Sequence, residues 1–353
     1  MTTTYRPIAR SLALLPLGVV ALALAACGDK GSSAAGADSA GSVASASAAT
    51  AAATGDSAAG DVAAPSAKGS LPGNRLGKIP VLEYHVIGGT KNSLYTRTVE
   101  SFRNDLEDVY RRGYRPINMT QLLDKDFSEV PVGMSPVVLV FDDASPEQFS
   151  YVERNGKLEV DPNSAIGIIL DFQKKHPDWK SRGVFCLLNG AGAGHNFFGD
   201  NPKWNGQKKE WRFQKVKWLA DQGYELCAHT LWHARLDKFS DAVVQEQLAR
   251  NVMGIDSAVS GYKVRSLALP YGIWPKNRAL AWSGSWKDPK TGQVHSYAFD
   301  AVMEVAGGPA LSPYDPKFNG HSINRIQAVG DDIRKTLDRL DSTRTRFVWD
   351  GGK

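Results

Sequence analysis

The sequence has no dense block of lysine or arginine. Its 353 residues carry 42 basic and 37 acidic side chains, and the two signs are interspersed along the chain. A net charge of +5 spread in this way gives a mildly basic surface, whereas nucleic-acid-binding segments usually concentrate their positive charge. We therefore expect no nucleic-acid partner.

A convincing membrane-spanning run is also lacking. The apolar stretch at residues 12–26 is too short and too rich in alanine to span a bilayer. It follows Arg6 and Arg10, as in a secretory signal peptide, and it ends in Leu-Ala-Ala before Cys27, which resembles the signal of bacterial lipoproteins. We predict that residues 1–26 are removed and that a lipidated Cys27 anchors an exported protein to a membrane of the cell envelope, inner or outer. An ordinary cleaved signal with an incidental cysteine is the alternative.

Large apolar residues are almost absent between Asp29 and Pro72, where alanine, serine and glycine dominate. Such a segment cannot bury a hydrophobic core. We interpret residues 27–73 as the lipidated cysteine followed by a flexible tether that lets the next domain reach away from the membrane. The globular part is then residues 74–353, the size of one domain.

Strand and helix signals alternate through this globular part. The run Val137–Phe141 is short, apolar and rich in β-branched residues, which is typical of a strand buried on both faces. Repeated alternation requires parallel strands joined by helical crossovers, so the sequence predicts an α/β fold, a (β/α) barrel of seven or eight parallel strands. We expect strands at 79–85, 114–117, 137–141, 183–188, 224–228, 264–269, 297–305 and 322–326, and helices at 98–112, 120–123, 165–175, 214–222, 240–260 and 331–340.

Polar residues stand where four of the predicted strands end. In a (β/α) barrel the carboxyl ends of the strands meet in one cleft, and active sites of this fold lie there. We therefore expect residues that are far apart in the sequence to converge in one site. They are His85 after the first strand, Asp142 and Asp143 after the third, His229 and His233 after the fifth, and Tyr271 after the sixth.

The residue types in this set suit a metal centre. Two imidazoles and one carboxylate with open positions favour Zn²⁺, although other divalent transition ions also bind such ligands. Adjacent residues on a strand point to opposite faces, so one of Asp142 and Asp143 can hold the metal while the other takes a proton. Taken singly, each motif is more often a solvated turn, a helix cap or a surface feature. Their agreement predicts metal-assisted hydrolysis of an amide or ester.

Three motifs carry a family resemblance. Phe141-Asp142-Asp143, His229-Thr-x-x-His233 and Pro270-Tyr271-Gly272, in this order, resemble the polysaccharide deacetylase family, also called carbohydrate esterase family 4 or NodB-like. The opening Pro-Val-Leu-x-Tyr-His at residues 80–85 and the Gly-Tyr-Glu-Leu at 223–226 look similar to this family as well.

The resemblance implies a fold, a reaction and residue roles. The fold would be a distorted (β/α) barrel, and the reaction would remove N-acetyl groups from N-acetylglucosamine polymers or O-acetyl groups from xylan. Asp142 would be the catalytic base, and the Tyr271 backbone would form part of the oxyanion site. The metal ligands would be Asp143, His229 and His233.

The chain departs from the family pattern at two positions. Ala144 stands where the family usually has glycine, and this change restricts the backbone. Ala268 stands where the family usually has an arginine that orients the base. The group that orients Asp142 is therefore open, with Arg325 as a candidate.

The general acid has two candidates. A similar loss of the arginine occurs in the branch that includes periplasmic poly-N-acetylglucosamine deacetylases, where the acid histidine comes from the first strand. That residue would be His85 here. The alternative is the late histidine His321, and we favour His85 because it ends a predicted strand.

Three functions follow from this interpretation. The first is a metal-dependent deacetylase acting on an N-acetylated glycan such as peptidoglycan or an exopolysaccharide. The second is an O-acetyl esterase with the same site. The third is a non-catalytic glycan-binding lipoprotein, which the missing arginine at Ala268 would favour and the retained Asp142 opposes.

Two further expectations concern cysteine and tryptophan. Cys186 and Cys227 lie in adjacent predicted strands, where we expect two buried thiols in preference to a disulfide. Trp204, Trp211 and Trp232 could stack on sugar rings, but packing of tryptophan into the protein is the favoured interpretation.

Overall fold

Seven parallel strands close into a barrel in the computed structural model, which describes residues 71–189 and 207–352. The ring closes because β1 pairs with β14 on one side and with β5 on the other. The predicted (β/α) barrel is therefore confirmed. In order around the ring the strands are β1 (Val81–Tyr84), β14 (Ile323–Gln327), β13 (Ala301–Gly307), β10 (Ser266–Ala268), β9 (Glu225–Ala228), β8 (Val184–Leu187) and β5 (Ser135–Phe141).

The predicted second strand is not a barrel strand. β4 (Tyr114–Pro116) pairs with residues 135–137 at the start of β5, whereas β1 pairs with residues 138–141 of the same strand. β4 therefore attaches beside the ring, because β1 occupies the part of β5 that closes the barrel.

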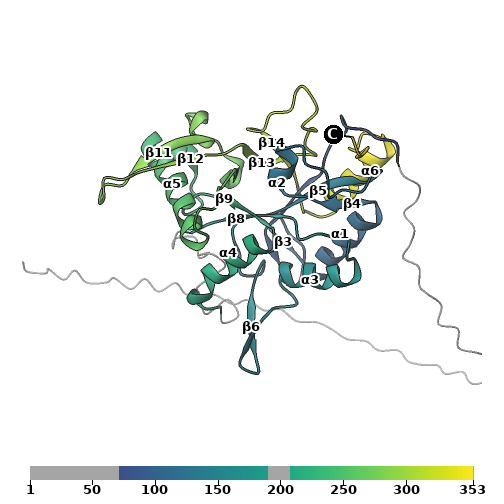
Figure 1. The fold of residues 1–353 in the computed structure, drawn as a ribbon, viewed down its shortest axis with the longest axis horizontal. Coiled ribbons are helices and arrows are strands. Elements are labelled where there is room, and N and C mark those ends of the chain that lie inside the picture. The colour runs from purple at the N-terminus through teal and green to yellow at the C-terminus, as the bar shows by residue number, and fades with distance from the viewer. Residues whose placement is uncertain (1–70, 190–206, 353) are drawn as a thin grey trace, which may run out of the picture. The chain divides into compact units, whose positions relative to one another are not determined.

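Helices lie outside the strands (Figure 1). Short side-chain caps begin two of them: the Thr98 hydroxyl accepts the Ser101 N–H at the start of α1, and the Ser164 hydroxyl accepts the Gly167 N–H at the start of α3. The predicted 165–175 helix matches α3. The helices are α1 (Val99–Arg111), α2 (Met119–Leu123), α3 (Ala165–Lys175), α4 (Arg212–Asp221), α5 (Asp241–Ala258) and α6 (Asp332–Ser342).

The strands bury both of their faces, as β5 illustrates. Val138 and Val140 pack in one cluster with residues of the neighbouring barrel strands, while Leu139 and Phe141 pack in another with the helices. The first cluster is thus the interior of the barrel and the second joins the barrel to its helical layer. All seven residues of β5 are buried, which accounts for its lack of polar alternation.

Cys186 and Cys227 form a disulfide, so the prediction of two buried thiols was wrong. The two residues are direct partners across β8 and β9, with Cα atoms 4.2 Å apart. Both belong to the interior cluster, so their side chains leave the strands on the same face. Register and strand spacing together bring the two sulfur atoms into bonding contact.

Three small two-stranded sheets were not predicted. The hairpin of β6 (Tyr151–Arg154) and β7 (Lys157–Val160) projects away from the barrel in Figure 1. β11 (Ser283–Lys287) and β12 (Val294–Ala298) form a second hairpin, and β2 (Val86–Ile87) pairs with β3 (Thr96–Arg97). The strand expected at 297–305 therefore merged the end of β12 with β13, which the chain separates at Phe299 and Asp300.

Some predictions fall outside the described residues. These are the signal peptide, the lipidated Cys27, the tether up to residue 70, and Trp204. Among the described residues, none of the helices combines the length and apolar character needed to cross a bilayer.

Candidate active site

The predicted site residues line one cavity at the carboxyl end of the barrel. Its volume is about 390 Å³. Most of the lining residues lie at or just after the ends of strands, since β1, β5, β9 and β10 end at residues 84, 141, 228 and 268. The lining residues are Glu83, His85, Leu94, Tyr95, Asp142, Asp143, His229, His233, Leu269, Tyr271, Val305 and Gln327.

Asp142 and Asp143 point to different partners, as the alternation of a strand requires. Asp142 is 2% exposed, and its Oδ1 lies 2.8 Å from Nη1 of Arg325. Asp143 faces the histidines, with Oδ1 3.3 Å from His229 Nε2 and 3.4 Å from His233 Nε2. The two carboxylates are therefore suited to different tasks.

Helix α5 supports the turn that carries the two histidines. The buried Asn251 accepts a hydrogen bond from the His229 N–H, and the Gln247 side chain accepts one from the Trp232 N–H. The Thr230 hydroxyl accepts the Ala234 N–H, which closes the turn. The His-x-x-x-His spacing therefore brings both rings to one side, with centroids 4.9 Å apart.

The carbonyl of Ala268 fixes the orientation of the His229 ring. His229 Nδ1 lies 2.8 Å from this oxygen, which can only accept, so Nδ1 carries the proton. When the ring is neutral, Nε2 has a lone pair directed toward Asp143, whose Oδ1 lies 3.3 Å away. Metal-binding histidines commonly have this arrangement.

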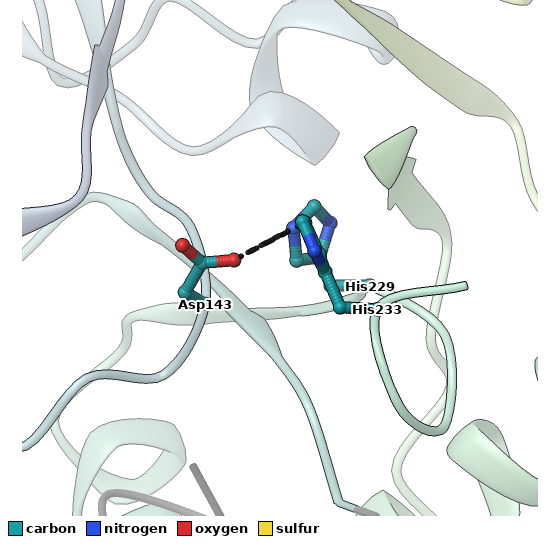
Figure 2. Close-up of side chains that lie close together, drawn as sticks. All are labelled: Asp143, His229 and His233. Carbon is teal, nitrogen blue, oxygen red and sulfur yellow. Dashed lines mark ion pairs between the residues drawn. The ribbon is translucent and has the colours of Figure 1, made fainter. Parts of the chain in front are cut away.

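The donor set of Asp143, His229 and His233 fits a divalent cation. Figure 2 shows the Asp143 carboxylate facing the imidazoles. Among the described residues, neither Asp143 Oδ1 nor His229 Nε2 has a hydrogen-bond partner, although both atoms are buried. One ligand atom from each of the three side chains lies within 4.8 Å of the others. Burying unsatisfied acceptors is costly, and a cation bound between them would offset that cost.

The charges of Asp143 and His233 suit metal binding. Burial raises the pKa of a carboxyl, but at Asp143 the histidines, His229 first, outweigh burial and hold the pKa well below its ordinary value. At Asp142 burial is outweighed chiefly by Arg325, which lowers the pKa. Burial, followed by the charge on His229, lowers the pKa of His233 to about 4. Asp143 is therefore ionised and His233 neutral near pH 7, as metal ligands must be.

Arg325 of β14 is the arginine that contacts Asp142, whose partner Ala268 left open. Its side chain is fully buried and contacts three acceptors: Asp142, the Glu304 carbonyl at 2.5 Å from Nε, and Glu83 at 3.1 Å from Nε. The candidate suggested by the sequence is thus the residue that contacts Asp142.

His85 and His321 lie at opposite ends of the barrel. His85 follows β1 and lines the cavity, whereas His321 precedes β14 and stacks on Trp282 at a centroid distance of 4.7 Å. The Gln148 side-chain amide donates to the His85 carbonyl at 2.9 Å and also to the Asp142 carbonyl. Of the two histidines considered as the acid, only His85 lines this cavity.

Tyr271 lies on the rim of the cavity. Its side chain is 52% exposed, and its ring centroid is 4.3 Å from that of His233. The turn at Pro270–Gly272 is held close to β13, since a Cβ at Gly272 would come within 2.5 Å of Val305 Cγ1. The Tyr271 backbone is thereby fixed beside the histidine turn.

Backbone strain is concentrated at this site. Eight non-glycine residues with positive φ occur among those described, and five belong to the site. Each such residue costs on the order of 1–3 kcal/mol and persists where the surroundings fix it. The five are Asp143 (φ 73°), Ala144 (52°), Thr230 (68°), His233 (61°) and Tyr271 (58°).

Six of the twelve lining residues were not predicted from the sequence, and two of these six lie beside His85. Glu83 stands two positions before His85, and the alternation of a strand would have placed both on the same face. Tyr95, in the segment between β2 and β3, is 53% exposed with its ring centroid 5.1 Å from that of His85. Of the tryptophans considered, Trp211 packs against Tyr151, whereas Trp232 is 41% exposed beside His233.

Comparisons with known proteins point to one family. The model of the polysaccharide deacetylase family matches residues 183–283, a segment that includes His229, His233 and Tyr271. A search of curated proteins found no significant match.

Two solved structures share the fold. One is the Streptococcus pyogenes deacetylase PplD in complex with acetate, with a TM-score of 0.51, 18% identity, and coverage of 74% of this chain and 98% of that chain. The other is IcaB from Ammonifex degensii, with a TM-score of 0.50, 16% identity, and coverage of 74% and 96%. The resemblance to the polysaccharide deacetylases that the motifs indicated is therefore confirmed, by the family model over residues 183–283 and by the barrel fold.

Proposed function

We propose that this chain is a metal-dependent hydrolase that removes acetyl groups from an N-acetylated glycan. The observation that carries the proposal is the meeting of an ionised carboxylate pair, a two-histidine turn and a third histidine in one cavity of about 390 Å³. The buried Asp142, which Arg325 holds in place, is suited to take a proton, and Asp143 is then free to bind the metal.

Asp143, His229 and His233 would hold the metal, and Zn²⁺ is the ion that this donor set favours. When bound there, the ion would polarise the acetyl carbonyl and lower the pKa of a nearby water.

The protein groups divide the remaining work. Asp142 accepts a proton from the attacking water as the new C–O bond forms at the acetyl carbon. The Tyr271 backbone N–H donates a hydrogen bond to the oxygen that becomes negative. His85 gives a proton to the departing nitrogen as the C–N bond breaks, so the products are acetate and a free amine on the sugar. The Asp142 proton is available to restore His85 for the next cycle.

Exposed aromatic side chains support a sugar substrate. Tyr95 and Tyr271 line the cavity with 53% and 52% of their surfaces exposed, and Trp232, which precedes the lining residue His233 in the sequence, is 41% exposed. Aromatic faces of this kind can stack on the apolar faces of sugar rings. We propose a polymeric glycan, either peptidoglycan or an exopolysaccharide, as the substrate.

We also propose that the enzyme works outside the cytoplasm, tethered to a membrane through a lipidated Cys27. The n-region, apolar stretch and cysteine at residues 6–27 support this proposal. The Cys186–Cys227 disulfide supports it independently, because structural disulfides are rare in reducing compartments. Replacing Cys27 with serine should release the protein from the membrane fraction.

Acetate release tests the proposed reaction. The purified protein, loaded with Zn²⁺, is incubated with N-acetylglucosamine oligomers, poly-N-acetylglucosamine, peptidoglycan and acetyl-xylan, with Asp142→Asn as the control. We expect acetate from an N-acetylated polymer and almost none from the variant. Acetate from acetyl-xylan alone would identify an O-acetyl esterase, and no acetate from a metal-loaded wild type would leave a glycan-binding protein.

A further inference from the structure

Glu83 is a fully buried carboxylate that the proposed mechanism does not use. It lies on β1, two residues before His85, and its side chain is 0% exposed. Among the described residues, neither of its oxygens has a hydrogen-bond partner by geometry. It also lines the catalytic cavity. Burial raises the pKa of Glu83 to about 8 against the opposing charge of Arg325, so placing this carboxyl group here costs stability and its contacts must explain its position.

The contacts of Glu83 connect Asp142 and Arg325 on one side of the site with His85 on the other. Glu83 Oε2 lies 3.1 Å from Arg325 Nε, and Arg325 Nη1 lies 2.8 Å from Asp142 Oδ1. On its other side, Glu83 Oε1 lies 3.6 Å from His85 Nε2. A continuous chain of ionisable groups thus runs from the base Asp142 through Arg325 and Glu83 to the acid His85.

We propose that Glu83 is a positioning residue that couples the catalytic base to the general acid. It holds the Arg325 guanidinium against Asp142 and faces the His85 imidazole, so that one side chain sets the placement of both proton-transfer groups. This inference rests on the proposed function, because it takes the roles of Asp142 and His85 from it.

The geometry explains why a single arginine needs this partner. Asp142 contacts only Nη1 of the guanidinium. A guanidinium held at one nitrogen alone can still change the orientation of its plane. Glu83 and the Glu304 carbonyl hold the Nε end, which fixes the plane of the guanidinium. The backbone of both proton-transfer residues is fixed separately, by Gln148, so Glu83 acts on their side chains.

The test compares Glu83→Gln with Arg325→Lys on two substrates. The first is the acetylated glycan that the wild type hydrolyses, whose amine must be protonated to leave. The second is 4-nitrophenyl acetate, whose leaving group departs without a proton. Both reactions need Asp142, but only the first needs His85.

We expect Glu83→Gln to lower kcat on the glycan by about tenfold to a hundredfold, as for other residues that orient reacting groups, with KM and metal content unchanged. The loss on 4-nitrophenyl acetate should be clearly smaller. Arg325→Lys should lower both rates by similar factors, because it acts through Asp142. Glu83→Gln keeps Arg325 and Asp142 as a neutral pair, so we expect it to fold; otherwise Glu83→Asp, which withdraws the carboxylate by one methylene, should give the same pattern.

Glu225 supplies a matched control. It is another buried glutamate on a barrel strand, but it binds Thr120 and Ser266 and does not line the cavity. Glu225→Gln should leave kcat on both substrates unchanged. Equal losses on the two substrates for Glu83→Gln, or none, would overturn the coupling.

A second readout does not depend on turnover. The ¹⁵N NMR shift of His85 Nε2 should change in Glu83→Gln and stay at its wild-type value in Glu225→Gln. If the wild type releases no acetate from any substrate, the proposed function fails while this shift still reports the Glu83–His85 contact. An unchanged shift in Glu83→Gln would refute the contact even in an active enzyme.

Discussion

Arg325 and Asp142 lie 183 residues apart in the sequence, yet their side chains form a buried ion pair at 2.8 Å. Closure of the barrel makes this possible, because β14 and β5 both pair with β1. The arginine that the family pattern would place at Ala268 of β10 is thus supplied from two strands further around the ring. The absence of arginine at Ala268 therefore does not leave Asp142 without a partner, which weakens the case for a non-catalytic protein.

Arg325→Met should reduce both stability and turnover. The change leaves the Asp142 carboxylate buried without a compensating cation, which costs on the order of 3–5 kcal/mol. Urea unfolding at pH 7 measures this cost, and acetate release measures the loss of activity. Arg334→Met, on the exposed face of α6, is the control and should stay within about 0.5 kcal/mol of wild type. A stable Arg325→Met variant with wild-type kcat would contradict the role of the ion pair.

Removing the metal should lower the melting temperature. A ligand that binds only the native state stabilises it by RT ln(1 + [L]/Kd), about 2.7 kcal/mol at a free concentration one hundred times Kd. Thermal unfolding with a chelator, and then with added Zn²⁺, should show a fall and a recovery. His229→Ala should abolish the response, because this side chain would supply a buried ligand atom, whereas His295→Ala in the β12 hairpin should retain it. The same Zn²⁺-dependent shift in His229→Ala would place the metal elsewhere.

The disulfide gives a prediction about thiol content. Protein prepared from an oxidising compartment should have no free thiol at Cys186 or Cys227 when unfolded in the presence of an alkylating agent. The bond closes a sequence separation of 41 residues, so its reduction should cost about 4 kcal/mol by the loop-entropy estimate. Mass spectrometry of the alkylated chain and urea unfolding with and without reductant provide the measurements. Two alkylated cysteines in unreduced protein would restore the interpretation as buried thiols.

Local patterns were sufficient for the seven barrel strands, the main helices and six of the cavity-lining residues. They were insufficient where strand register or contacts between distant segments determine the structure. The α3 helix and the strand ends that carry Asp142 and His229 follow from the spacing of apolar residues and from the polar residues that end each apolar run. The disulfide does not, because it depends on Cys186 and Cys227 being direct partners in one register of β8 and β9. Glu83 could have been found from strand alternation with His85, but its contact with Arg325 requires the closed ring.

Lys215 of α4 should make the stability of the protein depend on pH. Its side chain is fully buried, and burial lowers its pKa from 10.5 to about 7. Between these two values the unfolded chain binds more protons at this position than the folded one. The free energy of unfolding should therefore rise with pH across this range, by up to about 1.4 kcal/mol per pH unit, and the full penalty is present below pH 7.

Lys215→Met isolates this contribution. The variant should be more stable than wild type at pH 6.5, and the difference should shrink steadily toward pH 9.5, as measured by urea unfolding at intervals between these values. Oε1 of Gln207 accepts hydrogen bonds from Lys215 Nζ at 2.7 Å and from the Tyr151 N–H at 3.0 Å. In the variant this oxygen therefore keeps the hydrogen bond from Tyr151. Lys217→Met on the same helix is the control, because Lys217 is exposed and pairs with Asp221. A difference between Lys215→Met and wild type that does not vary with pH would mean that Lys215 remains charged in the folded protein.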